Sequence, residues 1–262
     1  MITVGYMTGA MVSDTAKEKY NLMAVPFEAV DGKGISLNAI NFANPTYTLQ
    51  PGTSDLVMFW KPEIQNYEQY FYYGFKGQEQ ALPPHWRLIG APKGEENYDY
   101  QHPEGIEPGT VFWYLSFHTT AAVNQSMTSS GAVASEPYQT IEITHKNGKD
   151  AYYFVSNPYP ADLDITWNGG DVIWSTDATY SLQPGTSDII MVWDAEKQNY
   201  DQYFFYGFKS QEVALPPTWR LVGGTASDVL TSIPAGTGFW YLAFKATGAD
   251  TVQTVRFNSP LK

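Results

Sequence analysis

The chain contains no cysteine, which excludes disulfide bonds, thiolate metal sites and cysteine nucleophiles. It also lacks long apolar runs. The longest, such as Leu56 to Trp60, fall far short of the roughly 20 residues that span a bilayer, so we expect no membrane span. No basic stretch followed by an apolar core opens the chain, so no signal peptide is visible.

Basic residues are scarce. The chain has 15 lysines and arginines against 27 aspartates and glutamates, a net charge of −12. The two halves, divided at Gly131, each carry a net charge of −6. Because an evenly acidic surface repels phosphate, we expect neither nucleic acid nor an anionic membrane as a partner.

The dominant feature of the chain is an internal repeat. Residues 46–90 align without a gap on residues 179–223, and 32 of these 45 positions are identical. Further along, residues 106–117 match residues 233–244. This repeat predicts two tandem homologous domains, residues 1–121 and residues 136–262, joined by a small, polar linker over residues 122–135.

The repeated segments have the periodicity of strands. Tyr67 to Lys76 alternates with period two and carries aromatic residues on both faces. Pro51-Gly52 and Pro184-Gly185 suit the centre of a type II turn. The one helix-like stretch is Asp14 to Tyr20, enough for one or two turns. We therefore predict an all-β chain of two β-sandwiches or small open barrels related by a pseudo-twofold axis.

The common enzyme motifs are absent: there is no G-x-G-x-x-G, P-loop, H-E-x-x-H or G-x-S-x-G. The candidates for catalysis are Asp55 and Asp188, in identical Pro-Gly-Thr-Ser-Asp contexts. If the axis placed them about 3–4 Å apart, they would share a proton and activate water, as in an aspartic protease. Alternatively, each closes its turn by accepting backbone N–H bonds. The Asp-Thr-Gly or Asp-Ser-Gly order of aspartic proteases does not occur.

Other polar residues allow weaker hypotheses. Glu63 with Glu196, or Glu79 with Glu212, could form a glycosidase pair, although their spacing singles out neither. Oxygen ligands for calcium occur in the second copy, where polar turns are the simpler explanation. The four histidines fall at positions that the other copy does not share, so we predict no metal site and no cofactor. The calcium candidates are Asp162, Asp164, Asn168 and Asp171, and the histidines are His85, His102, His118 and His145.

Aromatic residues are in surplus, with eight tryptophans, 19 tyrosines and 14 phenylalanines. Exposed aromatic rings provide platforms for the apolar faces of sugars, whereas the alternative is packing in the core or between domains. Arg87 and Arg220 each follow a tryptophan and could stack on its ring. The predicted ligand-binding residues are Tyr70, Tyr72, Trp86, Arg87, Tyr203, Phe205, Trp219 and Arg220.

The order of these motifs resembles a repeat domain of secreted or surface proteins of gut and environmental bacteria. The resemblance lies in Tyr20 to Phe27, a strand ending at Trp60, Tyr67-x-x-Tyr70, and the Gly-x-x-Phe-Trp-Tyr segments at Gly109 to Tyr114 and Gly236 to Tyr241. The chain is also similar to a mucin-degrading bacterial protein described as an aspartic protease. That similarity implies secretion, a glycoprotein substrate and acid catalysis by aspartates.

The sequence thus favours an extracellular, noncatalytic module that recognises glycan or mucin-type glycoprotein through exposed aromatic rings. The alternative is an aspartic-type peptidase that degrades mucin, and a third hypothesis is a structural spacer at the cell surface. All three imply a secreted or cell-surface protein whose leader has been removed.

Overall fold

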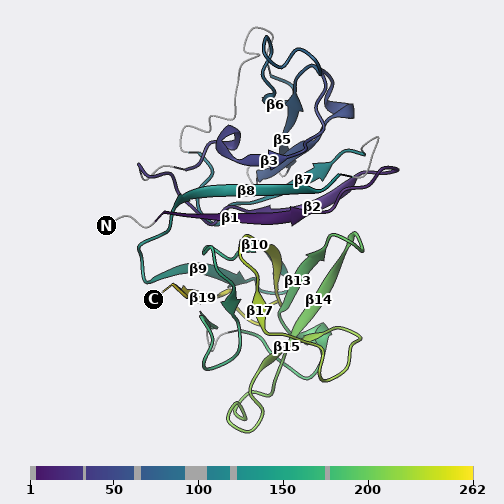
Figure 1. The fold of residues 1–262 in the computed structure, drawn as a ribbon. Coiled ribbons are helices and arrows are strands. Elements are labelled where there is room, and N and C mark those ends of the chain that lie inside the picture. Colours follow the sequence, from purple (N-terminus) through teal and green to yellow (C-terminus); the bar gives the residue numbers. More distant parts are fainter. Residues whose placement is uncertain are drawn as a thin grey trace. The chain divides into compact units, whose positions relative to one another are not determined.

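The computed structural model describes residues 4–31, 34–61, 66–91, 105–118, 123–174 and 178–261. It divides into unit 1, residues 1–134 with 195–198, and unit 2, residues 135–194 with 199–262. The described residues form antiparallel sheets with only three short 3-10 turns and no α-helix, so the all-β prediction is confirmed (Figure 1). No helix in this described part is long and apolar enough to cross a membrane.

Unit 1 contains two sheets. One has five strands in the order β2-β7-β4-β5-β6, and the other has three in the order β1-β8-β3. Its strands are β1 (Val4–Met11), β2 (Lys19–Ala24), β3 (Asn41–Ala43), β4 (Leu56–Lys61), β5 (Asn66–Tyr73), β6 (His85–Leu88), β7 (Val111–Ser116) and β8 (Gln125–Ala132).

The core of unit 1 draws apolar side chains from both sheets. Strand β7 lies between β2 and β4, and all six of its residues are buried. Phe112 and Phe59 come from the five-stranded sheet, whereas Met127 and Phe42 come from the three-stranded one, and all four belong to one buried cluster. Each sheet therefore buries one face against the same core.

Unit 2 has a larger sheet of six strands in the order β10-β18-β13-β14-β15-β16, a three-stranded sheet β12-β19-β9 and a two-stranded pair β11-β17. Its strands are β9 (Tyr138–His145), β10 (Ala151–Ser156), β11 (Leu163–Asp164), β12 (Val172–Ile173), β13 (Ile189–Asp194), β14 (Asn199–Tyr206), β15 (Thr218–Leu221), β16 (Val229–Leu230), β17 (Ser232–Ile233), β18 (Gly238–Ala243) and β19 (Thr251–Asn258).

The repeated sequence forms the same strand pairs in both units. Leu56 faces Phe71 across β4 and β5, and 133 residues later Ile189 faces Phe204 across β13 and β14. Strands β5 and β6 pair in the register that β14 and β15 repeat. Unit 2 differs in its β16 strand and in the β11-β17 pair, where unit 1 has a single bridge from Ile35.

The segment predicted as a linker is largely a strand, so that prediction is wrong for residues 125–132. Strand β8 pairs with β1 along all eight residues, and β3 pairs with its other edge. Its small residues are explained by close packing, because a Cβ on Gly131 would lie 2.3 Å from the Glu28 carbonyl oxygen. Residues 119–122 lie outside the described part of the chain.

Two local predictions also need correction. Asp14 to Tyr20 is not helical: the Asp14 carboxylate accepts a bond from Ala16 N, and the chain enters β2 at Lys19. The Pro-Gly turns are 3-10 turns, η2 (Pro51–Thr53) and η3 (Pro184–Thr186), and neither glycine has a positive φ. In η2 the Gln50 carbonyl accepts bonds from Thr53 N and from the Ser54 hydroxyl, and these bonds favour the tighter turn.

Gly52→Ala and Gly185→Ala should each stabilise the protein by about 0.4–1 kcal/mol. A Cβ meets no atom within 4 Å at either position, and alanine restricts the unfolded chain more than glycine does. Urea unfolding monitored by tryptophan fluorescence measures the change. Gly131→Ala is the opposing control and should destabilise the protein, because the Glu28 carbonyl blocks the new Cβ. Equal effects at Gly52 and Gly131 would contradict these backbone assignments.

Candidate functional site

Asp55 lies at the centre of a buried hydrogen-bond network in unit 1. Its side chain has no exposed surface and follows η2 at the entry to β4. The carboxylate accepts bonds from Thr46 N at 2.8 Å and Phe117 N at 2.7 Å. It also accepts bonds from the Tyr114 hydroxyl on β7 and from Gln125 Nε2 on β8, the latter at 3.0 Å. One carboxylate thereby connects the two sheets.

Asp188 has the equivalent position in unit 2 and is equally buried. It accepts bonds from Thr179 N at 2.9 Å, Phe244 N at 2.8 Å and the Tyr241 hydroxyl at 2.6 Å. Here the glutamine of the second sheet, Gln253, donates to the Tyr241 hydroxyl instead.

A histidine takes part in the unit 2 network. His145 Nδ1 lies 3.6 Å from Asp188 Oδ1 and 2.8 Å from the Phe244 carbonyl oxygen. His145 is 1% exposed, and its Nε2 has no hydrogen-bond partner among the described residues. The repeat alignment did not point to His145, because the first copy has no matching histidine.

Burial raises the pKa of Asp55 and the pKa of Asp188 to about 6. Removing a carboxylate from water disfavours its charged form. The surroundings of each group oppose this effect. The hydrogen bond from the Tyr114 hydroxyl lowers the pKa of Asp55 most, and the charge interaction with His145 lowers the pKa of Asp188 most. Both carboxyl groups titrate in the mildly acidic range as a result.

These contacts bear on the predicted roles of the two aspartates. Both close the chain behind a Pro-Gly turn by accepting backbone N–H bonds, which is the structural role that the turn sequence allows. Neither side chain is exposed, and each uses its oxygen atoms within its own unit. The shared-proton pair remains a prediction, whereas the observed bonds favour a role in folding.

The structure places most of the predicted binding aromatics inside the core. Tyr70, Trp86, Phe205 and Trp219 are at most 4% exposed, so the expectation that these rings are displayed is wrong. Tyr70 and Trp86 belong to the buried core cluster of unit 1, and Phe205 and Trp219 stack on each other in unit 2. Tyr72 is half-buried and remains accessible, as does Tyr203, which forms further interactions.

The two arginines stack on tyrosines of the neighbouring strand. The Arg87 guanidinium lies 4.8 Å from the Tyr73 ring centre, and that of Arg220 lies 3.5 Å from the Tyr206 ring centre. Successive side chains of a strand point to opposite faces, so an arginine cannot cover the tryptophan directly before it. The predicted stacking on Trp86 and Trp219 is therefore wrong.

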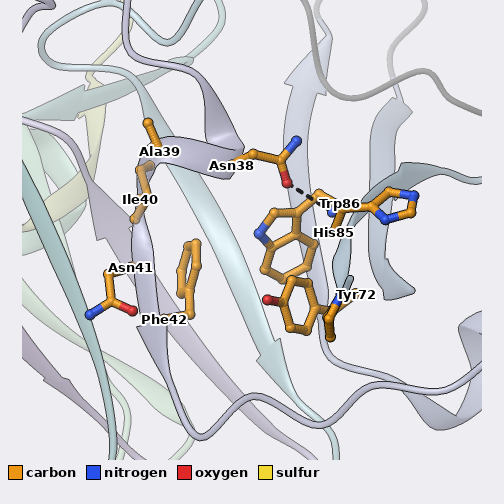
Figure 2. Close-up of a pocket in the computed structure, with 9 residues that line it drawn as sticks. Asn38, Ala39, Ile40, Asn41, Phe42, Tyr72, His85 and Trp86 are labelled. Atoms are coloured by element: carbon orange, nitrogen blue, oxygen red, sulfur yellow. Dashed lines mark hydrogen bonds between the residues drawn. The ribbon is translucent and has the colours of Figure 1, made fainter. Parts of the chain in front are cut away.

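Unit 1 contains a hollow of about 360 Å³ beside the buried rings. Figure 2 shows the Phe42 ring on one side, Trp86 and Tyr72 on the other, and the Tyr72 hydroxyl directed towards Phe42. Asn38 holds this arrangement, because its Oδ1 accepts a bond from Trp86 N at 3.0 Å. The unit 1 hollow is lined by residues 38–42, Tyr72 and residues 84–86.

Unit 2 has a hollow of about 340 Å³ beside strand β12, lined by residues 167–170 and 172–174. Trp174 there makes the ring contacts that Phe42 makes in unit 1. It stacks on Tyr241 at 6.2 Å and meets Trp219 edge-on at 5.0 Å, whereas Phe42 stacks on Tyr114 and meets Trp86. The two hollows share this location but differ in their walls.

The other repeated carboxylates have structural partners. Glu79 accepts bonds from the Tyr47 hydroxyl and Gly77 N, and Glu212 accepts the equivalent bonds from Tyr180 and Ser210. These bonds hold the pKa of both glutamates below the usual range. They close the turn after β5 or β14, and Glu63 lies outside the described residues.

The calcium candidates form a turn instead of a metal cage. Asp164 accepts bonds from Thr166, Asp171 accepts one from Asp164 N, and Asp162 accepts one from Ala235 N. Over the described ranges, no three histidine, aspartate or glutamate side chains are grouped as a metal site would require. His102 is not among the described residues, whereas His85 lines the unit 1 hollow.

Comparison with known proteins identifies no relative. No protein-family model matches the chain, and no curated protein is significantly similar to it. The resemblance drawn from the sequence motifs therefore remains a hypothesis, and the function has to be argued from the geometry of the two units.

The raised pKa values predict how stability changes with pH. Between about pH 4 and pH 6 folded Asp55 binds a proton that the unfolded chain does not, so its contribution to stability is greatest below pH 4 and falls as pH rises through 6. The wild type should lose up to about 3 kcal/mol of unfolding free energy relative to Asp55→Asn between pH 4 and pH 7. Urea unfolding across this range measures the unfolding free energy of both proteins. A difference that stays constant, or that changes in favour of the wild type as pH rises, would contradict the prediction.

Proposed function

We propose that the two units are duplicated copies of one β-sandwich related by a pseudo-twofold axis. The identical strand registers, 133 residues apart, support this proposal. So do the buried Asp-Tyr pairs, which occupy equivalent positions at the start of β4 and of β13. Such a duplication gives the chain two versions of every surface feature, and each version can diverge separately.

We further propose that the protein is an extracellular module that binds glycan or mucin-type glycoprotein in the unit 1 hollow. The observation that carries this proposal is a hollow of about 360 Å³ that combines aromatic rings with amide side chains. Ligand sites have this character, with apolar walls and a few polar groups that fix orientation. The volume suits one or two sugar rings.

The residues of the hollow divide the recognition of a sugar between them. Tyr72 offers a half-buried ring to the apolar face of a pyranose and a hydroxyl to its edge. Asn38 and Asn41 are exposed and present amide groups, which both donate to and accept from sugar hydroxyls. Trp86 lies behind Tyr72, 4.9 Å from its ring centre, and supports it from the core.

Charge narrows the class of glycan. The chain carries a net charge of −12, and the residues that line the hollow include one histidine, His85, but no lysine or arginine. A sialylated or sulfated sugar would meet the repulsion of an acidic chain without a lysine or arginine to pair with. Neutral mucin-type glycans are therefore the proposed ligands. A structural spacer would not require such a hollow. The proposal includes a secreted or cell-surface location for the protein.

Asn41→Ala and Tyr72→Phe should each weaken binding of a neutral mucin-type glycan by about 2- to 10-fold, the effect of one lost hydrogen bond. Tyr72→Phe should fold normally, because unit 2 has Phe205 at the aligned position. Calorimetry with millimolar glycan measures the affinity, and Gln80→Ala, an exposed change outside the hollow, is the control. No heat with the wild type would contradict the proposal. Trp86→Ala is unsuitable because Trp86 belongs to the core.

The alternative function is an aspartic-type peptidase that degrades mucin, and two matched carboxyl groups with pKa near 6 are the observation in its favour. On this alternative, the wild type cleaves mucin or casein between about pH 3 and pH 6, whereas Asp55→Asn and Asp188→Asn abolish cleavage. Circular dichroism must show that both variants are folded, and Asp14→Asn serves as a control for a carboxylate outside the buried networks. Full activity in both variants, or none in the wild type, would rule this function out.

A further inference from the structure

The chain leading to Trp174 in unit 2 is longer than the matching chain of unit 1. Leu163 and Ile35 mark the start of the two segments. Leu163 pairs with Ile233 and Ile35 pairs with Ile106, and these two isoleucines are aligned in the repeat. Eleven positions separate Leu163 from Trp174, and seven separate Ile35 from Phe42. The extra four residues form a turn that begins at Trp167.

Trp167 covers a ring pair that has an exact counterpart in unit 1. Its ring centre lies 5.8 Å from that of Phe205 and 6.1 Å from that of Tyr180. In the repeat these two residues align with Tyr72 and Tyr47, which meet edge-on at 5.8 Å. The indole of unit 2 thus lies against the ring that, in unit 1, borders the hollow.

The hollows reflect this difference. The unit 1 hollow is lined in part by Tyr72 and Trp86. The lining of the unit 2 hollow includes Trp167 and Trp174 but not Phe205 or Trp219, the residues aligned with Tyr72 and Trp86. Trp167 therefore stands between open space and the Phe205 ring. In unit 1 the shorter chain carries Asn38 at its 3-10 turn, η1 (Leu37–Ala39), and leaves the Tyr72 side open.

The turn that carries Trp167 is firmly held. The Asp164 carboxylate accepts bonds from Thr166 N at 2.8 Å and from the Thr166 hydroxyl at 2.7 Å. Asp171 accepts a bond from Asp164 N and donates its own N–H to the Asp164 carbonyl oxygen at 2.7 Å. Gly170 allows the closure, since a Cβ there would lie 2.5 Å from that carbonyl. The indole is a fixed part of unit 2.

Ring packing, not a polar contact, holds the indole in place. Trp167 Nε1 is buried and has no hydrogen-bond partner among the described residues. Leaving such a donor unpaired is unfavourable, so the packing of the ring against Phe205 and Tyr180 outweighs that cost. The position therefore accommodates a ring that is held mainly by packing against its aromatic neighbours.

We propose that Trp167 occupies, in unit 2, the ring position that unit 1 leaves open, and that this open position takes one pyranose ring packed against Tyr72. The identity of the ring as a sugar rests on the proposed function, whereas the position itself rests on the comparison of the two units. Of the two equivalent positions in the described residues, unit 1 then offers an open ring site, because unit 2 fills its own.

Free indole is the probe for this position. By NMR titration, wild-type protein should bind one indole, with resonance shifts at Tyr72 and Trp86 and none at Phe205 and Trp219. Trp167→Ala should bind two, and millimolar indole should raise its lowered urea midpoint. The matched control, Trp193→Ala, removes a half-buried tryptophan outside both hollows and should still bind one.

Wild-type shifts at Phe205, no indole bound to the wild type, or no second indole in folded Trp167→Ala would each overturn the inference. If Trp167→Ala does not fold, the wild-type titration alone tests the inference: resonance shifts at Tyr72 and Trp86 support it, and shifts at Phe205 contradict it. A neutral glycan should displace indole from Tyr72. Glycan binding without displacement overturns the inference and the placement of the glycan in the unit 1 hollow, but leaves glycan binding by the protein intact. Indole at Tyr72 with no glycan binding supports the ring position and overturns the proposed function.

Discussion

In each unit a buried aspartate carboxylate joins segments that are far apart in the sequence. Asp55 accepts bonds from the loop before η2, from the chain after β7, and from Tyr114 and Gln125 in two different sheets. A buried carboxylate that loses a partner is strongly destabilising, because its charge is left without compensation. The two sheets of unit 1 are therefore held together by a bond set that tolerates little displacement.

This constraint also positions the hollow. The Asp55 carbonyl oxygen accepts a bond from Tyr72 N at 2.9 Å, so the residue that ties the sheets together also fixes the backbone of the ring that borders the open space. Tyr114, which donates to the carboxylate, stacks on Phe42 at 5.1 Å. Phe42 thus packs on the tyrosine that donates to the carboxylate, and Tyr72 is bonded through its backbone to Asp55 itself. On the proposed function, rings supported in this way are preorganised and would lose little entropy on binding.

The sequence predicted the strands correctly because strand periodicity depends on local alternation. The alternation of Tyr67 to Lys76 is visible without the fold, and β5 follows it. It did not predict which face of each strand is covered, because that depends on the second sheet. Trp86 and Trp219 were misplaced for this reason. The linker was misjudged since the small residues of β8 resemble a flexible segment, whereas Gly131 is required by the close Glu28 carbonyl.

The role of Trp167 could not be predicted from the sequence, for a related reason. The N-terminal parts of the repeat align weakly, so nothing in the residues alone places Trp167 against Phe205. Only the strand pairing shows that Leu163 matches Ile35 and that four residues have been added before Trp174. The strongly repeated segments contain most partners of the buried aspartates and also Tyr72 and residues 84–86 of the hollow. The weakly repeated segment supplies the rest of the lining, residues 38–42, none of which bonds to the Asp55 carboxylate. Divergence is therefore concentrated where the ring position lies, and the same scaffold can hold an open site in one copy and a filled one in the other.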